Sequence, residues 1–273
     1  MKGMKRGNIA AYIVIALFII LLLFPLYIML KISLSAPSDM FAEDPPYIIK
    51  NLTFGHFKDV FASGDRFISP FKKSLITAFL ASLLSLMISV PAAYGISRFN
   101  YKIKYIFILI IFFTRMMPEI SLALPISIIF IRSGLFDTIP GLTLAHLIRI
   151  LPISCFILVG VFSSLPIELE KQARIDGCSR LQALRKVVIP LSWGGVSVAW
   201  IFSFLFSWDE FIYASYLTLA KPTMPIKMYY YISRGDIFYS ATYAVIITIP
   251  VLLMTFAMQK YIRPGYFSGA MKG

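Results

Sequence analysis

The sequence predicts an all-α integral membrane protein with six transmembrane helices. Of its 273 residues, 59% are hydrophobic and 14% are charged, and the mean hydropathy is +0.80. Soluble domains hold about 45–50% apolar residues, so the solvent for most of this chain is lipid. Six long apolar runs indicate the same class, because each is long enough to cross the roughly 30 Å hydrocarbon core as a helix.

The first span is predicted over residues 9–30, a run without any charged residue. Lys2, Lys5 and Arg6 precede it, as in a secretory signal peptide. The run is longer than the roughly 7–15 apolar residues of such a peptide, so a retained helix is expected. The other five spans are predicted over residues 75–97, 103–131, 139–164, 191–219 and 241–262.

The distribution of Lys and Arg predicts that both termini lie on the cytoplasmic side of the plasma (inner) membrane. Threading six spans this way places fourteen Lys and Arg residues inside and ten outside. The short loop of residues 98–104 holds three basic residues and no acid, and it gives the clearest indication. The predicted parts are the N-terminus with the first helix (1–35), an external loop (36–70), a membrane core (71–262) with a cytoplasmic loop (165–190), and a cytoplasmic tail (263–273).

The net charge of +13 does not predict a nucleic-acid partner, because the basic residues lie between apolar segments that contact membrane lipid. Cys155 lies in an apolar run and Cys178 in a polar one, so no disulfide is expected. His56 and His146 stand alone in the sequence. No metal site is predicted.

The polar segment 165–190 has the pattern of two short helices. Pro166 suits a helix start, and Glu168 and Glu170 follow in the first turn, where carboxylates stabilise the positive end of the helix dipole. Gly177 fits a helix end, and Ser179 fits the N-cap of the next helix. A rigid knob and an ordinary loop on the membrane surface explain this pattern equally well.

The segment resembles the EAA loop of type I ABC importer permeases, whose pattern is Glu-Ala-Ala, three residues, Gly, nine residues, then Ile-x-Leu-Pro. Ala173, Gly177 and Pro190 hold their places, whereas Lys171 stands where the glutamate is usual. The Trp208-Asp209-Glu210-Phe211 cluster and the tail 269–273 resemble the carbohydrate branch of this family. The match is nearest to the smaller permease subunit of maltose-type systems and covers nearly the whole chain.

The resemblance implies a type I ABC importer permease fold and a coupling helix that docks on a cytoplasmic ATPase. The implied partners are a second permease subunit in a heterodimer, two ATP-binding-cassette ATPase subunits, an external solute-binding protein and a carbohydrate, expected to be a di- or oligosaccharide. The family's glutamate is expected to meet a basic residue of the ATPase, so either Glu170 replaces it here or the partner differs. The implied coupling residues are Glu170, Lys171, Ala173, Asp176, Gly177 and Arg180.

No Gly-x-x-x-x-Gly-Lys-Ser/Thr motif occurs in the 273 residues, so this chain has no such cradle for nucleotide phosphates. ATP and magnesium are therefore expected in the partner ATPase. The chain itself is predicted to be a transport subunit without catalytic residues or a cofactor.

Charged residues inside the predicted spans are expected to face a cavity or one another, since each costs at least about 2.5–3.5 kcal/mol there. Our hypothesis is that some of them line the substrate pathway. A kinked span with a local Arg115–Glu119 pair, and an interfacial aromatic belt for the tryptophan, are the alternatives. The predicted pathway residues are Glu119, Arg149, Trp208, Asp209 and Glu210.

Three rival functions stay open at the level of sequence. A type I ABC importer for amino acids or polyamines shares the EAA loop. A secondary carrier would also use buried acids. A membrane scaffold would need no cavity, and the intramembrane charges argue against it. The small, glycine-rich tail, including residues 268–273, resembles the tails that reach into the ATPase interface in the maltose-type branch, and this resemblance implies a role in coupling.

Overall fold

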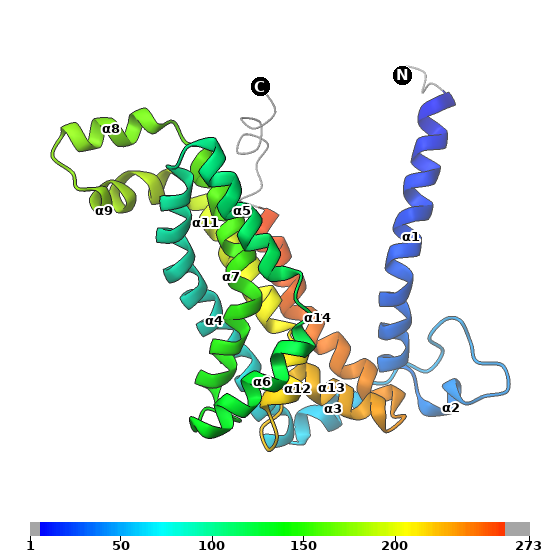
Figure 1. Cartoon of the computed structure of the whole chain (residues 1–273). Coiled ribbons are helices and arrows are strands. Elements are labelled where there is room, and N and C mark those ends of the chain that lie inside the picture. The colour runs from blue at the N-terminus through cyan, green and yellow to red at the C-terminus, as the bar shows by residue number, and fades with distance from the viewer. Residues whose placement is uncertain (1–5, 260–273) are drawn as a thin grey trace. The chain divides into compact units, whose positions relative to one another are not determined.

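The structure, a computed structural model, describes residues 6–259 (Figure 1). The predicted tail 263–273 lies outside the described residues. Within 6–259 the chain is helical, and its only strand-like contact is one antiparallel bridge between Ser35 and Leu52. The described residues form two compact units, 6–68 with 227–249 and 69–226 with 250–259.

Four of the described helices are long and apolar enough to cross a membrane: α1 (Arg6–Leu34), α4 (Asp65–Ser97), α7 (Ile139–Ser163) and α14 (Ile237–Gln259). Two bent helix pairs bring the number to six if each pair is one span. The predicted all-α class is thereby confirmed, with four to six candidate spans among the described residues. The orientation with both termini inside stays a prediction.

The first unit joins α1 to short helices of the predicted external loop, α2 (Pro37–Met40) and α3 (Gly55–Ala62), and to α13 (Met224–Ser233) and the start of α14. Stacked aromatic rings connect these elements of the first unit. His56 stacks on Phe238 with ring centroids 4.8 Å apart, and Tyr231 stacks on Tyr243 at 5.2 Å. Side chains of α1 from residue 11 to 24 are exposed, as expected for a helix that meets lipid or another protein.

The second unit contains the candidate site, and α7 lies in its core. Helix α11 (Trp193–Trp208) packs along α7. Leu158 and Phe162 of α7 and Ala199 of α11 are fully buried in one hydrophobic core. The two helices approach closely at Gly195, where an added Cβ would lie 2.5 Å from the Val161 methyl groups. Only glycine fits this contact without a shift.

The third predicted span, residues 103–131, is broken into α5 (Tyr101–Arg115) and α6 (Glu119–Arg132), which meet at 79°. The break occurs at Pro118. A proline disfavours the helical backbone conformation of the residue before it, so α5 ends ahead of this position. The predicted fifth span, 191–219, is also interrupted. Helix α11 ends at Trp208, and the short α12 (Ile212–Leu217) follows as a separate element.

The polar segment folds into α8 (Ile167–Ile175), α9 (Arg180–Ala183), a π-helical turn (Leu184–Val188) and α10 (Ile189–Leu191). We call residues 165–191 the α8–α9 hairpin. Figure 1 shows it at one end of the second unit, with α6 and α12 at the other end. The chain then bends by 84° into α11.

Candidate functional site

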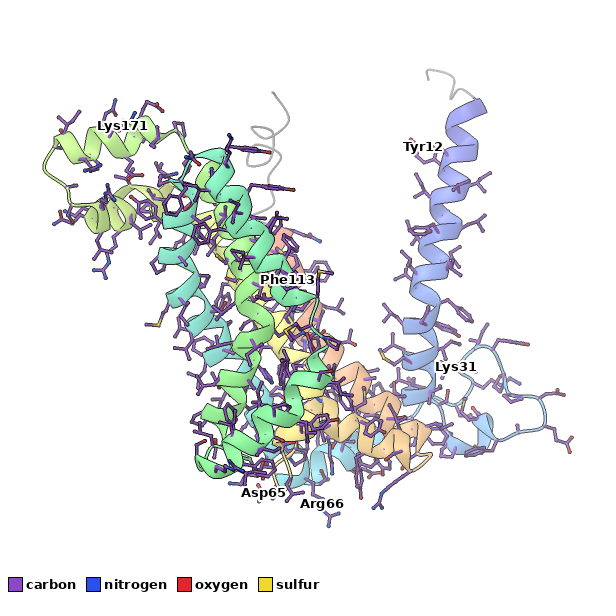
Figure 2. All side chains as sticks on the ribbon, viewed as in Figure 1. Tyr12, Lys31, Asp65, Arg66, Phe113 and Lys171 are labelled. Carbon is purple, nitrogen blue, oxygen red and sulfur yellow. The ribbon has the colours of Figure 1, made fainter. Side chains whose placement is uncertain are left out.

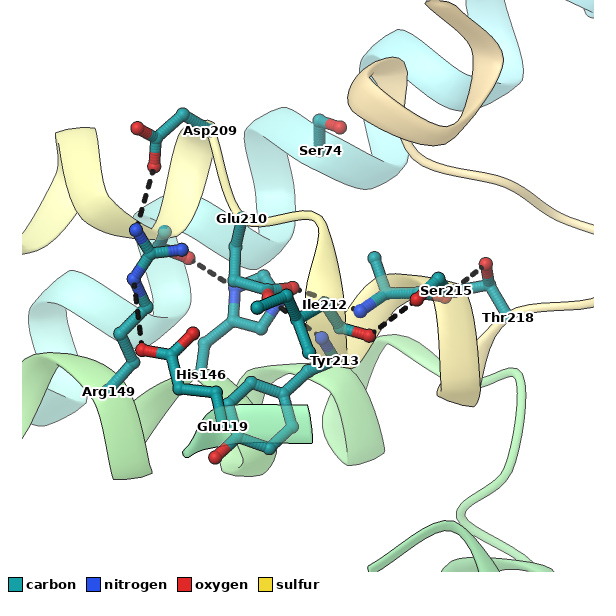
Figure 3. A network of polar contacts seen from close by, with 12 residues as sticks. Ser74, Glu119, His146, Arg149, Asp209, Glu210, Ile212, Tyr213, Ser215 and Thr218 are labelled. Carbon is teal, nitrogen blue, oxygen red and sulfur yellow. Dashed lines mark hydrogen bonds and ion pairs between the residues drawn. The ribbon is translucent and has the colours of Figure 1, made fainter. Parts of the chain in front are cut away.

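The charged residues of the predicted pathway come from three elements. Glu119 lies in the first turn of α6, Arg149 near the middle of α7, and Asp209 directly after α11. Arg149 lies between the two acids: its Nε is 3.7 Å from Glu119 Oε1, and its Nη2 is 3.9 Å from Asp209 Oδ1 (Figure 3). We call Arg115, Glu119, Arg149 and Asp209 the charged network.

The local Arg115–Glu119 pair predicted as an alternative exists, with 3.8 Å between Nη1 and Oε1. It is one part of a larger arrangement, because Arg115 also donates a 2.9 Å hydrogen bond to the backbone oxygen of Arg149. The Asp209 side chain is 56% exposed, against 25% for Glu119 and 19% for Arg149. The charged network therefore has an open end at Asp209.

Glu210 lies apart from the charged network, inside the protein. Its carboxylate accepts hydrogen bonds from the backbone N–H groups of Tyr213 (2.7 Å) and Ala214 (2.9 Å) at the start of α12. It also lies 3.1 Å from Nε2 of His146, whose Nδ1 is 2.6 Å from the Ser207 hydroxyl (Figure 3). This geometry fixes the chain between α11 and α12.

Trp208 is 1% exposed. Its ring stacks on Phe204, with centroids 6.1 Å apart, and meets the Phe71 ring edge-on at 5.9 Å. A sugar could stack on Trp208 only if this packing opened. Asp209 is therefore the member of the predicted Trp208–Glu210 triplet that faces outward in this structure.

Sequence reasoning missed the partners of Glu210. His146 stands alone in the sequence, because its contact with Glu210 depends on the packing of α11 against α7. A signal was present, because His146 and Arg149 are three residues apart and share a face of one helix. On that face of α7, His146 contacts Ser207 of α11, and Arg149 contacts Glu119 of α6.

The α8–α9 hairpin has the local structure that the sequence predicted. Gly177 ends α8 with a φ of 88°, a conformation that side chains disfavour. Ser179 caps α9, since its Oγ accepts from the Gln182 N–H at 3.3 Å while the Gln182 side chain accepts from the Ser179 N–H at 2.8 Å. These caps satisfy backbone groups at both ends of the turn and give the hairpin a defined local structure.

Glu170 is the only one of the six predicted coupling residues that is buried. It accepts a 2.7 Å hydrogen bond from Arg98 Nε and a second bond from the Tyr94 hydroxyl. Arg98 also donates to the backbone oxygen of Phe162 at 3.0 Å. The Arg98–Glu170 pair thus joins α8 to the ends of α4 and α7.

Burial alone would raise the pKa of the Glu170 carboxyl, but hydrogen bonds from Tyr94 and Arg98 and the Arg98 charge bring that pKa below its usual value. Glu170 therefore stays ionised at neutral pH. Lys171, Asp176, Gly177 and Arg180 are exposed, and Ala173 is half-buried. The exposed surface of the hairpin is available for a partner.

A helical membrane bundle that holds charges inside and carries a rigid polar hairpin at one end has the architecture of a membrane transport subunit. A family model described as the inner membrane component of binding-protein-dependent transport systems matches residues 85–268, and this chain belongs to that family. It is a multi-pass protein of the plasma membrane.

Two relatives and one solved structure agree with this assignment. The trehalose transport system permease protein SugB of Mycobacterium tuberculosis is 32% identical, over 88% of this chain and 90% of that protein. The trehalose/maltose transport system permease protein MalG of Thermococcus litoralis is 31% identical, over 93% of both chains. A bacterial ABC transporter involved in the import of the acidic polysaccharide alginate matches with a TM-score of 0.77 at 19% identity, covering 96% of this chain and 100% of that chain. The predicted type I ABC importer permease fold is confirmed.

Proposed function

We propose that this chain is the permease subunit of an ATP-driven importer that takes up a di- or oligosaccharide delivered by an external solute-binding protein. The α8–α9 hairpin carries the proposal. It is a capped, rigid and largely exposed element that the Arg98–Glu170 pair fixes to α4 and α7. Such an element can transmit a movement of a docked ATPase to the membrane helices. The sugars named for the relatives support the substrate class.

The proposed partners are two ATPase subunits and a second, similar permease. ATP and magnesium belong to the ATPase subunits, since this chain lacks the Gly-x-x-x-x-Gly-Lys-Ser/Thr phosphate cradle. The open end of the charged network supports the second permease. A carboxylate as exposed as Asp209 has to be covered by protein or water inside a membrane.

ATP hydrolysis by the purified complex in liposomes, with and without sugar-loaded binding protein, tests this function. We expect loaded binding protein to stimulate hydrolysis and Gly177→Pro to abolish the stimulation, because proline cannot adopt the φ of 88° at the hairpin turn. Gly134→Pro is the matched control. Gly134 has a φ of 72° and also donates one backbone hydrogen bond, but it lies in the turn after α6.

The outcomes separate the rival functions. Stimulated hydrolysis that survives Gly177→Pro would contradict the role of the hairpin. Uptake that continues after the ATPase is inhibited would favour a secondary carrier. If arginine or a polyamine, and no sugar, stimulates hydrolysis, the importer stands and the substrate class is wrong.

We also propose that Glu119, Arg149 and Asp209 contact the sugar during passage. Their ion pairs of 3.7–3.9 Å are longer than hydrogen bonds, so hydroxyl groups can bind to the same donors and acceptors. A hydrogen bond to a charged group contributes about 1.5–3 kcal/mol, which corresponds to roughly a 10- to 150-fold change. Asp209→Asn is therefore expected to lower sugar uptake by about 10-fold or more.

Glu43→Gln is the control for Asp209→Asn, because it removes an exposed carboxylate in the predicted external loop. Uptake rates at several sugar concentrations, normalised to the amount of assembled complex, are the measurement. Unchanged uptake in Asp209→Asn would remove Asp209 from the pathway.

A further inference from the structure

The exposed surface of the α8–α9 hairpin is basic. Of its three acidic residues, Glu170 is held inside by Arg98, so Glu168 and Asp176 are the exposed acids. Five basic side chains are exposed on the same hairpin, namely Lys171, Arg174, Arg180, Arg185 and Lys186. A surface with this excess of positive charge is complementary to an acidic partner.

Apolar side chains stand among these charges. Ile175 is 85% exposed and Leu181 is 55% exposed. On α8, Lys171 and Ile175 are one turn apart and therefore share a face. An apolar patch rimmed by charges is typical of a protein docking surface, and Ile175 and Leu181 supply exposed apolar groups within this basic surface.

Lys171 lies on the outer side of α8, as Figure 2 shows. The Glu170 carboxylate beside it is already hydrogen-bonded to Tyr94 and Arg98, so it does not neutralise the Lys171 ammonium. If a docked subunit covered Lys171 without offering an opposite charge, burying the ammonium would weaken docking. A docking partner that covers Lys171 must therefore supply an anionic group at this position.

We infer that the ATPase subunit that docks on the α8–α9 hairpin presents an aspartate or glutamate to Lys171, next to an apolar pocket for Ile175. The inference rests on the proposed function and adds the chemistry of the partner surface. A protein partner explains the observations better than an anionic lipid surface does, because the exposed acids Glu168 and Asp176 lie among the basic residues. The Arg98–Glu170 pair fixes the hairpin, and Lys171 selects the partner.

Carbodiimide crosslinking tests this contact, since it joins a lysine amine to a carboxylate without a spacer. The purified complex with its ATPase is treated in nanodiscs that contain phosphatidylserine, and linked peptides are identified by mass spectrometry. We expect Lys171 to be linked to an aspartate or glutamate of the ATPase subunit. Lys171→Arg should keep the ATPase bound but lose this link, whereas Lys171→Glu should weaken assembly by about 10-fold or more.

Three other outcomes would contradict either the inference about Lys171 or the proposed function. A link from Lys171 to phosphatidylserine alone would show a lipid contact and refute the inference. Intact complex without any Lys171 link, together with normal assembly of Lys171→Glu, would refute it as well. If the wild-type chain carries no ATPase subunit through purification, the proposed function fails, and the inference fails with it.

Discussion

Removal of the Glu170 carboxylate should loosen the α8–α9 hairpin before it affects the rest of the protein. Glu170 accepts two hydrogen bonds, one of them from the Arg98 guanidinium, and the two side chains are 10% and 17% exposed. Hydrogen bonds to charged groups contribute about 1.5–3 kcal/mol each, and breaking a fully buried pair costs about 3–5 kcal/mol. With the partial exposure taken into account, Glu170→Ala should cost about 2–3 kcal/mol.

Hydrogen exchange of the α8 amides, followed by mass spectrometry, measures this loss locally. A cost of about 2–3 kcal/mol corresponds to roughly 30- to 150-fold faster exchange where opening of α8 limits the rate. Combining Glu170→Ala with Arg98→Ala completes a double-mutant cycle, and a coupling energy of about 1–3 kcal/mol is expected. Glu168→Ala is the control, because Glu168 is an exposed acid of the same helix turn.

The pH dependence of the same stabilisation has a defined sign. The pKa of Glu170 is lower in the folded protein than its usual value of 4.5. The stabilisation is therefore complete above about pH 4.5 and is lost as the pH falls through the lower folded-state pKa. Glu170→Gln should exchange faster than the wild type at pH 7 and approach it at low pH. Equal exchange of wild type, Glu170→Ala and Arg98→Ala at pH 7 would refute the reasoning.

Two further predictions test the packing of the core and the orientation of the chain. Gly195→Ala should destabilise the protein by about 1–3 kcal/mol in detergent unfolding, because its Cβ would lie 2.5 Å from the Val161 methyl groups. Gly160→Ala is the control, because a Cβ added at Gly160 would meet nothing within 4 Å. Adding Val161→Ala to the Gly195→Ala variant should restore stability, since it removes the methyl groups that the new Cβ would meet. Cys178 in the hairpin reports orientation. In a Cys155→Ser background, a membrane-impermeant maleimide should label Cys178 only after the membrane is permeabilised, and labelling of intact cells would contradict the predicted topology.

Local sequence signals predicted the α8–α9 hairpin well. Pro166, Gly177 and Ser179 each act within one helix turn, so their effect is readable from neighbouring residues. The inward position of Glu170 was not readable in this way. Its partner Arg98 is 72 residues away in sequence, and only the packing of α8 near the ends of α4 and α7 brings them together.

The membrane spans show the same limit. Apolar length predicted the candidate spans, and the sequence offered a kink in the third one as an alternative. Neither signal predicted the size of that bend, 79°, or that α11 ends at Trp208. A hydropathy average depends only on which residues lie in a window of sequence. It contains no information on the direction of the helix axis. The His146–Glu210 contact was missed for a related reason, since only the packing of α11 along α7 brings these two residues close.

The break between α5 and α6 places two helix ends within the predicted third span. The C-terminal end of α5 carries a partial negative charge and has Arg115 in its last turn, whereas the N-terminal end of α6 carries a partial positive charge and has Glu119 in its first turn. Each half-helix thus brings the counter-charge for its own dipole. Neither terminus at this bend is therefore left without an opposite charge beside it.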